Sequence, residues 1–155
     1  MNVMRWTDRS LKRLGNFEAF ASGSRRWRST EVHDHAARLA SALLSLGLAP
    51  GDRVLLWLPN SVELVIAWRA VLRAGGVVVV AHRSSPLQQI QHLLAETQPK
   101  AIVTFAALDQ AAFGATVRHR IHVGPQEALG SIALADLVGR ESPLRDPIAR
   151  ADDDV

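Results

Sequence analysis

The sequence predicts an α/β fold, in which a layered parallel sheet is covered by flanking helices. Three short apolar runs, at residues 53–58, 77–80 and 101–105, have the composition of strands that are buried on both faces. Segments with helical spacing of apolar residues precede and separate these runs. Strands that alternate with helices pair in parallel through right-handed crossovers. We therefore expect one parallel sheet with helices packed against it.

The first helix of this pattern is predicted over residues 31–46, where apolar residues recur at helical spacing. Gly47 follows at the position where helices take a left-handed C-terminal cap. The sequence Pro50-Gly51-Asp52 then indicates a turn before the first strand. Pro59 ends that strand.

A second helix follows the first strand, with Asn60 or Ser61 as its N-terminal cap and Glu63 completing a capping box. Gly75 and Gly76 end it, and helix termination explains these glycines better than a nucleotide-binding loop does. Its buried side is expected to hold Leu64, Val65, Trp68, Val71 and Leu72.

A third helix is predicted after a loop at residues 81–84. Ser85 is the expected hydroxyl cap, Pro86 the first helical residue and Gln88 the partner that completes a capping box. Residues 97–99 end the helix. Beyond the third strand, the sequence indicates a short helical segment that ends at Phe113 and Gly114.

The pattern weakens towards the C-terminus, with a strand over residues 121–123 and a brief helix over residues 132–138. Three regions are expected: a basic extension at 1–29, an α/β subdomain at 30–138 and a connector at 139–155. In the extension, Gly23 and Ser24 break any helix that begins near Leu11.

The composition excludes several classes of site and of protein. At 155 residues and 48% hydrophobic content, the chain is long enough for one packed core. The absence of cysteine excludes a disulfide framework, a thiolate nucleophile and a cysteine metal site, and it fits a reducing compartment such as the cytoplasm. No run approaches the roughly 18 apolar residues of a membrane span, and the N-terminus lacks the apolar centre of a secretion signal.

The net charge of +3 is modest, and the basic residues are scattered except at Arg25, Arg26 and Arg28. This distribution argues against nucleic-acid binding. Trp27 lies among these arginines, but one aromatic residue in a short basic cluster is thin evidence for a base-stacking surface. Trp57 and Trp68 are expected in the core, and Trp6 is assigned to neither role.

Four short motifs occur in order between Trp27 and Phe105. They are Gly47 with Pro50-Gly51-Asp52-Arg53-Val54, Leu58-Pro59-Asn60-Ser61 with Glu63, Leu72-Arg73-Ala74-Gly75, and Lys100-Ala101-Ile102-Val103-Thr104. Together they resemble the N-terminal part of the adenylate-forming superfamily, which includes acyl-CoA ligases, aryl-CoA ligases, luciferases and peptide-synthetase adenylation domains. The Leu-Pro-Asn-Ser corner is more similar to the CoA-ligase branch. The chain departs from the family at residues 80–83, where Val-Ala-His-Arg replaces a Pro-Leu-Asn-Pro-like stretch.

The resemblance implies chemistry in which a carboxylic acid and ATP form an acyl-adenylate and pyrophosphate, with Mg²⁺, before the acyl group passes to CoA. The family's phosphate loop, its Tyr-Gly-x-Thr-Glu segment, its ribose-binding Asp and its catalytic Lys have no counterpart here. The chain contains no tyrosine, and its last residues, 152–155, resemble the acidic segment just before the phosphate loop. We therefore expect a ligase portion that ends before the nucleotide machinery, with no catalytic or metal-binding residue, and that is inactive by itself. Its cofactor-binding residues stay unknown.

Two alternatives stay open. The first is a separate α/β interaction module that complements a ligase remainder encoded elsewhere. The second is an unrelated flavodoxin-like or small basic nucleic-acid-binding domain. The ligase portion and the interaction module both predict a sheet that lacks its later strands, and hence self-association through an exposed edge.

Other candidate residues have simpler explanations. His82 and Arg83 are expected at the carboxyl end of a strand, where open α/β sheets bind ligands, but a helix start explains the same residues. His33 and His35 point to different helix faces, and His119 and His122 lack a third ligand, so both make poor metal pairs. Asp152, Asp153 and Asp154 would hold Mg²⁺ only weakly and are better explained as a solvated connector.

Overall fold

A computed structural model describes residues 3–105, 113, 117–124 and 130–150. Along the chain, the helices and strands are α1 (Met4–Leu14), β1 (Glu18–Ser22), β2 (Arg25–Arg28), α2 (Ser29–Ser45), β3 (Arg53–Leu58), α3 (Val62–Arg73), β4 (Val77–His82), α4 (Leu87–Thr97), β5 (Ala101–Thr104), β6 (His119–His122), β7 (Ile132–Ala133) and α5 (Leu134–Arg140).

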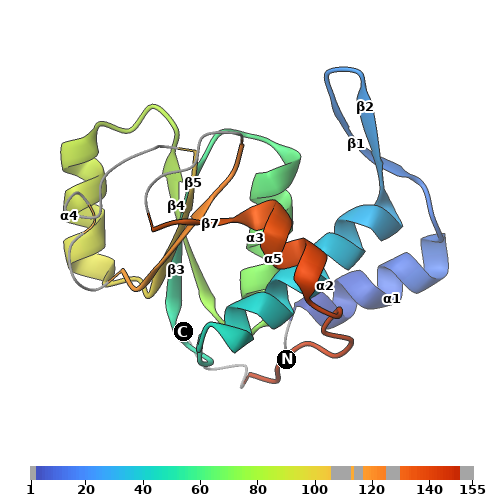
Figure 1. Ribbon diagram of the computed structural model, residues 1–155. Coiled ribbons are helices and arrows are strands. Elements are labelled where there is room, and N and C mark those ends of the chain that lie inside the picture. Colours follow the sequence, from blue (N-terminus) through green and yellow to red (C-terminus); the bar gives the residue numbers. More distant parts are fainter. Residues whose placement is uncertain (1–2, 106–112, 114–116, 125–129, 151–155) are drawn as a thin grey trace.

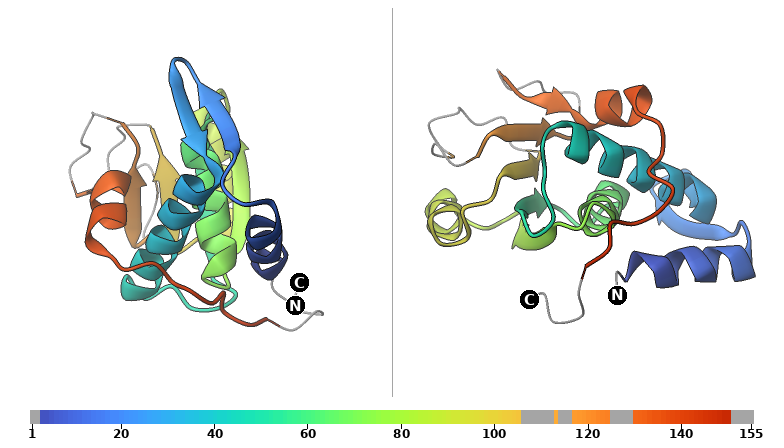
Figure 2. Two further views of the ribbon diagram at one scale, coloured as in Figure 1. Left: turned by 90° about the vertical axis from the view of Figure 1, so that its right-hand side faces the viewer. Right: turned by 90° about the horizontal axis from the view of Figure 1, so that it is seen from below.

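The central sheet has five parallel strands in the order β4-β3-β5-β6-β7 (Figure 1). Leu55 of β3 aligns with Val79 of β4 on one side and with Ile102 of β5 on the other. Helices α2, α3 and α5 cover one face of the sheet, and α4 covers the other face (Figures 1 and 2). This arrangement confirms the layered α/β fold that the alternation of strands and helices predicts.

Strand β3 is buried on both of its faces. Val54 and Leu56 belong to the core formed with α2 and α3, whereas Leu55 and Trp57 belong to a second core formed with α4. Because alternate residues of a strand point to opposite faces, a strand covered on both sides needs a continuous apolar run. The run at residues 53–58 meets this requirement, and the strand was predicted with the same bounds.

The turn between α2 and β3 is fixed by side-chain contacts. The amide of Ala49 donates a hydrogen bond of 2.7 Å to the Asp52 carboxylate. The Lys100 ammonium lies 2.8 Å from the same oxygen and donates a second bond of 2.6 Å to the Gly47 carbonyl. Gly47 has a φ of 85°, as expected for the predicted left-handed cap. The contacts of Lys100 thus join the start of β5 to the end of α2.

Strand β4 differs from the prediction in two ways. It extends to His82, so part of the predicted loop at residues 81–84 is strand. Its side chains are also less buried than expected, and Val80 is 46% exposed. The reason is position: β4 pairs only with β3 and forms an edge of the described sheet. A run of valines suits an edge strand as well as a central one.

The start of α4 was predicted incorrectly. Pro86 is the N-cap residue, with an extended ψ of 150°, and no side chain caps the helix. The Ser85 amide instead donates 2.9 Å to the His82 carbonyl in a tight turn. Because this turn fixes Ser85 before the helix begins, its hydroxyl does not act as the predicted cap.

Helix α3 begins at the predicted corner, where the Ser61 hydroxyl accepts a hydrogen bond of 3.3 Å from the Leu64 amide. The prediction that Trp68 is buried was wrong, because this side chain is 44% exposed. Trp57 is buried as predicted, and its indole Nε1 donates 3.0 Å to the His82 carbonyl.

Residues before Thr30, expected to form a weakly patterned extension, contain α1 and the antiparallel hairpin β1–β2. Trp27 of this hairpin is only 6% exposed and belongs to the main core. The expected connector is also attached to the fold, because the Leu144 amide donates 3.0 Å to the Ala37 carbonyl. The proposed domain boundaries stay predictions.

The C-terminal elements lie close to their predicted places. The strand expected at residues 121–123 is β6, His119–His122. The first two residues of the helix expected at 132–138 form the strand β7 instead, and the helix itself is α5, which begins at Leu134 and continues to Arg140. The predicted helical segment before Phe113 and the acidic residues 152–154 lie outside the described residues.

Candidate functional site

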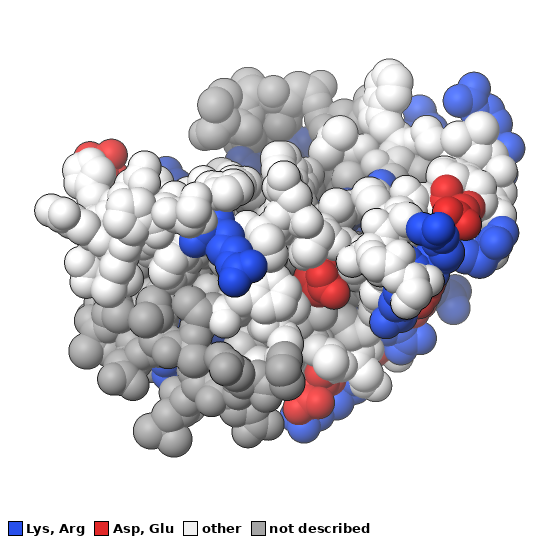
Figure 3. Space-filling view, turned by 90° about the horizontal axis from the view of Figure 1, so that it is seen from above, with Lys and Arg blue, Asp and Glu red and all other residues white. Residues whose placement is uncertain are grey.

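The carboxyl ends of the parallel strands share one edge of the sheet. Asn60 and Ser61 follow β3, Phe105 follows β5, and Gly124 lies just beyond β6. Ligands of open α/β sheets bind in crevices at this edge. Figure 3 looks onto this end of the molecule, where uncharged surface occupies much of the centre and charged side chains gather towards one side.

A groove of about 430 Å³ lies at this edge. We call it the β6–α5 groove. Its lining residues come from the hairpin, α2, the first part of α3, the end of β6 and the segment after it, β7 and α5: Arg25, Trp27, His35, Glu63, Ile66, His122, Val123, Gly124, Ala133, Leu134, Ala135, Val138 and Gly139. Its volume lies within the range of small-molecule sites.

Aromatic and cationic groups pack tightly at the hairpin side of the groove. The Arg25 guanidinium lies 3.5 Å from the centre of the Trp27 ring and 2.9 Å from the Glu31 carboxylate. The His35 ring meets Trp27 edge-on at a centroid distance of 5.6 Å. Arg25 and Trp27 therefore contact each other, and Trp27 is not an exposed platform for stacking a base.

The histidines of the groove are held by local partners. His35 Nδ1 lies 2.9 Å from the Glu31 carbonyl and therefore donates to it. His122 is almost fully buried, and its Nδ1 lies 2.8 Å from the Ser131 hydroxyl. The groove thus combines an apolar wall with a few oriented polar groups.

His82 and Arg83 lie at the carboxyl end of β4, as their position in the sequence predicts. The Ser84 amide donates 3.3 Å to His82 Nδ1, and the Ser84 hydroxyl lies 2.7 Å from the same nitrogen. Because an amide can only donate, Nδ1 is the acceptor and carries no proton in this arrangement. His82 is therefore fixed by its own turn, and neither residue lines the β6–α5 groove.

The two histidine pairs that were considered as metal sites do not form clusters. His33 Nδ1 lies 3.6 Å from Asp8, whereas His35 contacts Trp27 on another side of α2. His119 and His122 lie three positions apart on β6, so their side chains leave opposite faces. Within residues 3–105, 113, 117–124 and 130–150, no group of three His, Asp or Glu side chains could hold a metal ion.

Comparison with known proteins identifies the family of the chain. The sequence model described as AMP-binding enzyme matches residues 7–152. The chain belongs to the AMP-binding enzyme family. The predicted resemblance to adenylate-forming enzymes is therefore confirmed.

Two relatives of this chain come from Mycobacterium tuberculosis. A 3-(7a-methyl-1,5-dioxo-octahydro-1H-inden-4-yl)propanoyl:CoA ligase is 35% identical over 132 residues, which cover 78% of this chain and 25% of that ligase. A p-hydroxybenzoic acid–AMP ligase is 38% identical over 117 residues, which cover 68% of this chain and 16% of that ligase. The chain thus spans about a quarter or less of these relatives.

Solved structures show the same fold. An anthranilate CoA ligase in complex with anthranoyl-AMP matches 97% of this chain and 30% of its own, with a TM-score of 0.88 and 19% identity. A benzoate CoA ligase from Burkholderia xenovorans matches 99% of this chain and 31% of its own, with a TM-score of 0.82 and 22% identity. None of the described helices combines the length and the apolar composition that a membrane span requires.

One charged cluster of the chain was not predicted from its sequence. Arg73 is only 2% exposed and donates hydrogen bonds to Asp8, to the Leu144 carbonyl at 3.1 Å and to the Arg145 carbonyl at 2.9 Å. A signal existed in the helical spacing, because Arg73 lies seven residues after the buried Ile66 and so falls on the same face of α3. Its three acceptors, however, come from segments that are distant in the sequence.

Proposed function

We propose that this chain forms the amino-terminal part of an ATP-dependent carboxylic acid–CoA ligase. The family match over residues 7–152 carries the proposal, since it covers nearly the whole chain. The matched CoA ligase of M. tuberculosis supports it, because 78% of this chain aligns with only 25% of that ligase. A CoA ligase or an acid–AMP ligase activates a carboxylic acid, so this class of substrate follows from both relatives.

Within such an enzyme, the chain acts as a scaffold and supplies one wall of a binding region. The β6–α5 groove is largely apolar, and three of its polar members, Arg25, His35 and His122, are already bound to neighbours. Side chains held in this way define the shape of the groove and orient its polar groups. The groups that react with the acid are supplied by the remainder of the enzyme.

The described residues do not fit a triphosphate and its magnesium ion. A triphosphate cradle needs several free backbone amides and cations, and magnesium needs oxygen ligands. At the start of α3, the Leu64 amide is bound to the Ser61 hydroxyl. Among the described residues, no cluster of three acidic or histidine side chains is available. We therefore assign no step with ATP or magnesium to these residues.

The first experiment measures exchange of pyrophosphate into ATP by the purified chain, with benzoate and hexanoate as acids. We expect no exchange, because the reacting groups are absent from the scaffold. The Leu55→Asp variant places a carboxylate in the core between β4 and β5 and serves as an unfolded control for contaminating ligase. Exchange by the native chain above this control would refute the proposed inactivity.

The second experiment tests complementation. The chain is produced with the polypeptide encoded downstream of the Val155 codon, once as a continuous chain and once as two separate polypeptides. We expect CoA-ester formation from the continuous chain. Activity from the two separate polypeptides would favour the interaction-module alternative, and a continuous chain that folds but forms neither acyl-adenylate nor CoA ester would contradict the ligase assignment.

We also propose that the chain resides in the cytoplasm, where ATP and CoA are available. A chain without cysteine has no disulfide to lose, so its composition is compatible with a reducing compartment. Fractionation of cells with an antibody to the native chain tests this assignment, and recovery outside the cytoplasmic fraction would contradict it.

A further inference from the structure

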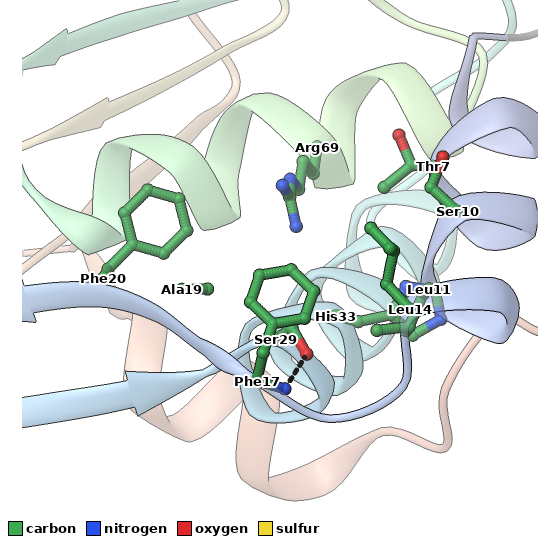
Figure 4. A pocket seen from close by; sticks show the side chains of 10 residues that line it. All are labelled: Thr7, Ser10, Leu11, Leu14, Phe17, Ala19, Phe20, Ser29, His33 and Arg69. Atoms are coloured by element: carbon green, nitrogen blue, oxygen red, sulfur yellow. Dashed lines mark hydrogen bonds between the residues drawn. The ribbon is translucent and has the colours of Figure 1, made fainter.

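A second cavity lies between α1, the first strand of the hairpin and α3. Its volume is about 210 Å³, which is below the range of drug-sized sites and suits a small ligand. We call it the α1–β1 pocket. Figure 4 shows that apolar side chains surround it, namely Leu11, Leu14, Phe17 and Phe20. Leu14 and Phe17 are also exposed to solvent, which leaves an apolar surface open at the pocket.

Arg69 brings a cation into these apolar surroundings. Figure 4 shows its side chain reaching from α3 into the space between Phe20 and Leu11. The guanidinium is half-buried, and burial lowers the pKa of Arg69 below its ordinary value. Within the part of the chain that the structure describes, it makes no hydrogen bond or ion pair, which is a costly state for a partly desolvated charge.

The neighbouring charges do not compensate Arg69. The nearby carboxylate of Asp8 accepts a hydrogen bond from Arg73 and lies 3.6 Å from His33 Nδ1. Burial and the Arg73 guanidinium lower the pKa of His33, which disfavours a charged imidazole at this position. The Asp8 carboxylate is therefore already engaged by Arg73, and no described side chain forms an ion pair with Arg69.

The polar groups beside the pocket differ in what they can still bind. The Ser29 hydroxyl has no proton left to donate, since it accepts from the Phe17 amide at 3.1 Å and donates to the Gly15 carbonyl at 3.1 Å. The hydroxyls of Thr7 and Ser10 line the α1 side. A ligand that satisfied Arg69 would therefore need an anionic end and an apolar body.

We propose that the α1–β1 pocket binds a small monocarboxylate, with its carboxylate paired to Arg69 and its apolar body against Leu11, Phe17 and Phe20. A planar guanidinium can hold both oxygens of a carboxylate, which favours this anion over a neutral polar group. The site goes beyond the proposed ligase function and does not depend on it, because binding is measured without ATP or CoA.

The test is a titration of the isotope-labelled chain with benzoate and hexanoate, followed by nuclear magnetic resonance of the backbone amides. We expect saturable shifts at Leu11, Phe17 and Ala19. Acetate lacks the apolar body and hexanamide lacks the charge, so each is expected to bind at least about tenfold more weakly than hexanoate.

Two variants and one control separate the pocket from other basic surface. Arg69→Met keeps much of the side-chain volume and is expected to weaken hexanoate binding at least about tenfold. Ala19→Leu keeps the charge and fills the pocket, so it is expected to block binding. The matched control Arg9→Met removes an exposed arginine on α1 and is expected to leave the dissociation constant unchanged. Thermal unfolding of each variant establishes that it is folded.

Three results would overturn the proposal. One is the absence of saturable shifts with either carboxylate in the folded native chain. Another is unchanged hexanoate binding by Arg69→Met or by Ala19→Leu, which would place the ligand elsewhere. The third is equal binding of hexanamide and hexanoate, which would show an apolar surface with no use for the charge. Concentration-dependent broadening confined to Leu14 and Phe17, without any effect of carboxylate, would instead indicate contact with a second copy of the chain.

Discussion

The guanidinium of Arg73 in α3 donates a hydrogen bond to the carboxylate of Asp8 in α1. Arg73 is almost completely buried, and the Asp8 side chain is 20% exposed. This pair attaches the first helix of the chain to the helical layer that covers the sheet. It shows that the region before Thr30 is held by a charge contact as well as by the burial of Trp27.

Loss of the Asp8 carboxylate is predicted to destabilise the fold. Asp8→Asn leaves the buried Arg73 charge without its anion, and breaking such pairs costs about 3 kcal/mol. The free energy of unfolding in urea measures the effect. The control Asp136→Asn breaks the exposed pair with Arg140, whose atoms lie 3.7 Å apart, and is expected to cost less than about 1 kcal/mol. Equal effects of the two substitutions would contradict a special role for Asp8.

Alanine substitution at Gly75 and at Gly47 separates the cost of close packing from the cost of backbone strain. Both have positive φ, 78° and 85°, so alanine is strained at either position. A Cβ at Gly75 would also lie 3.0 Å from Ile148 Cγ2, whereas a Cβ at Gly47 meets nothing within 4 Å. We predict a cost of about 1 kcal/mol for Gly47→Ala and a larger cost for Gly75→Ala in urea unfolding. A larger effect at Gly47 would contradict the close packing of residue 148.

The pH dependence of stability is predicted to contain a contribution from Asp52. Burial raises the pKa of this carboxyl, but the hydrogen bonds from Lys100 and the Ala49 amide outweigh burial, so the pKa is lowered. The unfolded chain then binds the proton more readily, and the stabilisation, present above the unfolded pKa, is lost as pH falls through the folded one. Urea midpoints between pH 6 and pH 3 should fall less steeply for Asp52→Asn than for the native chain. Parallel profiles would exclude the contribution.

Association of the chain is predicted to involve the exposed edge at β4. Val80 is 46% exposed on a strand that has one described neighbour, and such edges pair with other chains. Val80→Lys is expected to lower the concentration-dependent mass in analytical ultracentrifugation. The control Val3→Lys changes an equally apolar, exposed residue outside the sheet. If both substitutions lower association equally, the β4 edge is not the contact.

The sequence predicts those elements whose neighbours lie close along the chain. Strand β3 and helix α2 follow from their own apolar patterns, and the cap at Ser61 follows from its local sequence. The edge position of β4 could not be predicted, because it depends on which strands pair. Four valines have the same local signature in the centre and at the edge of a sheet.

The candidate sites depend even more on distant contacts. The β6–α5 groove combines Trp27 with His122, and the α1–β1 pocket combines Leu11 with Arg69. No motif joins either pair in the sequence. The half-buried position of Arg69 could not be predicted either, because an arginine in a helix usually lies in solvent. Its apolar surroundings arise only when α1 and the hairpin pack around it.

The order of biosynthesis also decides which hydrogen bonds of Arg73 can form first. Two of its acceptors, the carbonyls of Leu144 and Arg145, lie 71 and 72 residues later in the chain. A ribosome that adds about 5–20 residues per second needs roughly 4–14 s to reach them. Asp8 is synthesised long before Arg73. During that interval its carboxylate is therefore available to Arg73, whereas the carbonyls of Leu144 and Arg145 are not yet made. The nascent helical layer can therefore form around this pair first and gain the C-terminal segment afterwards.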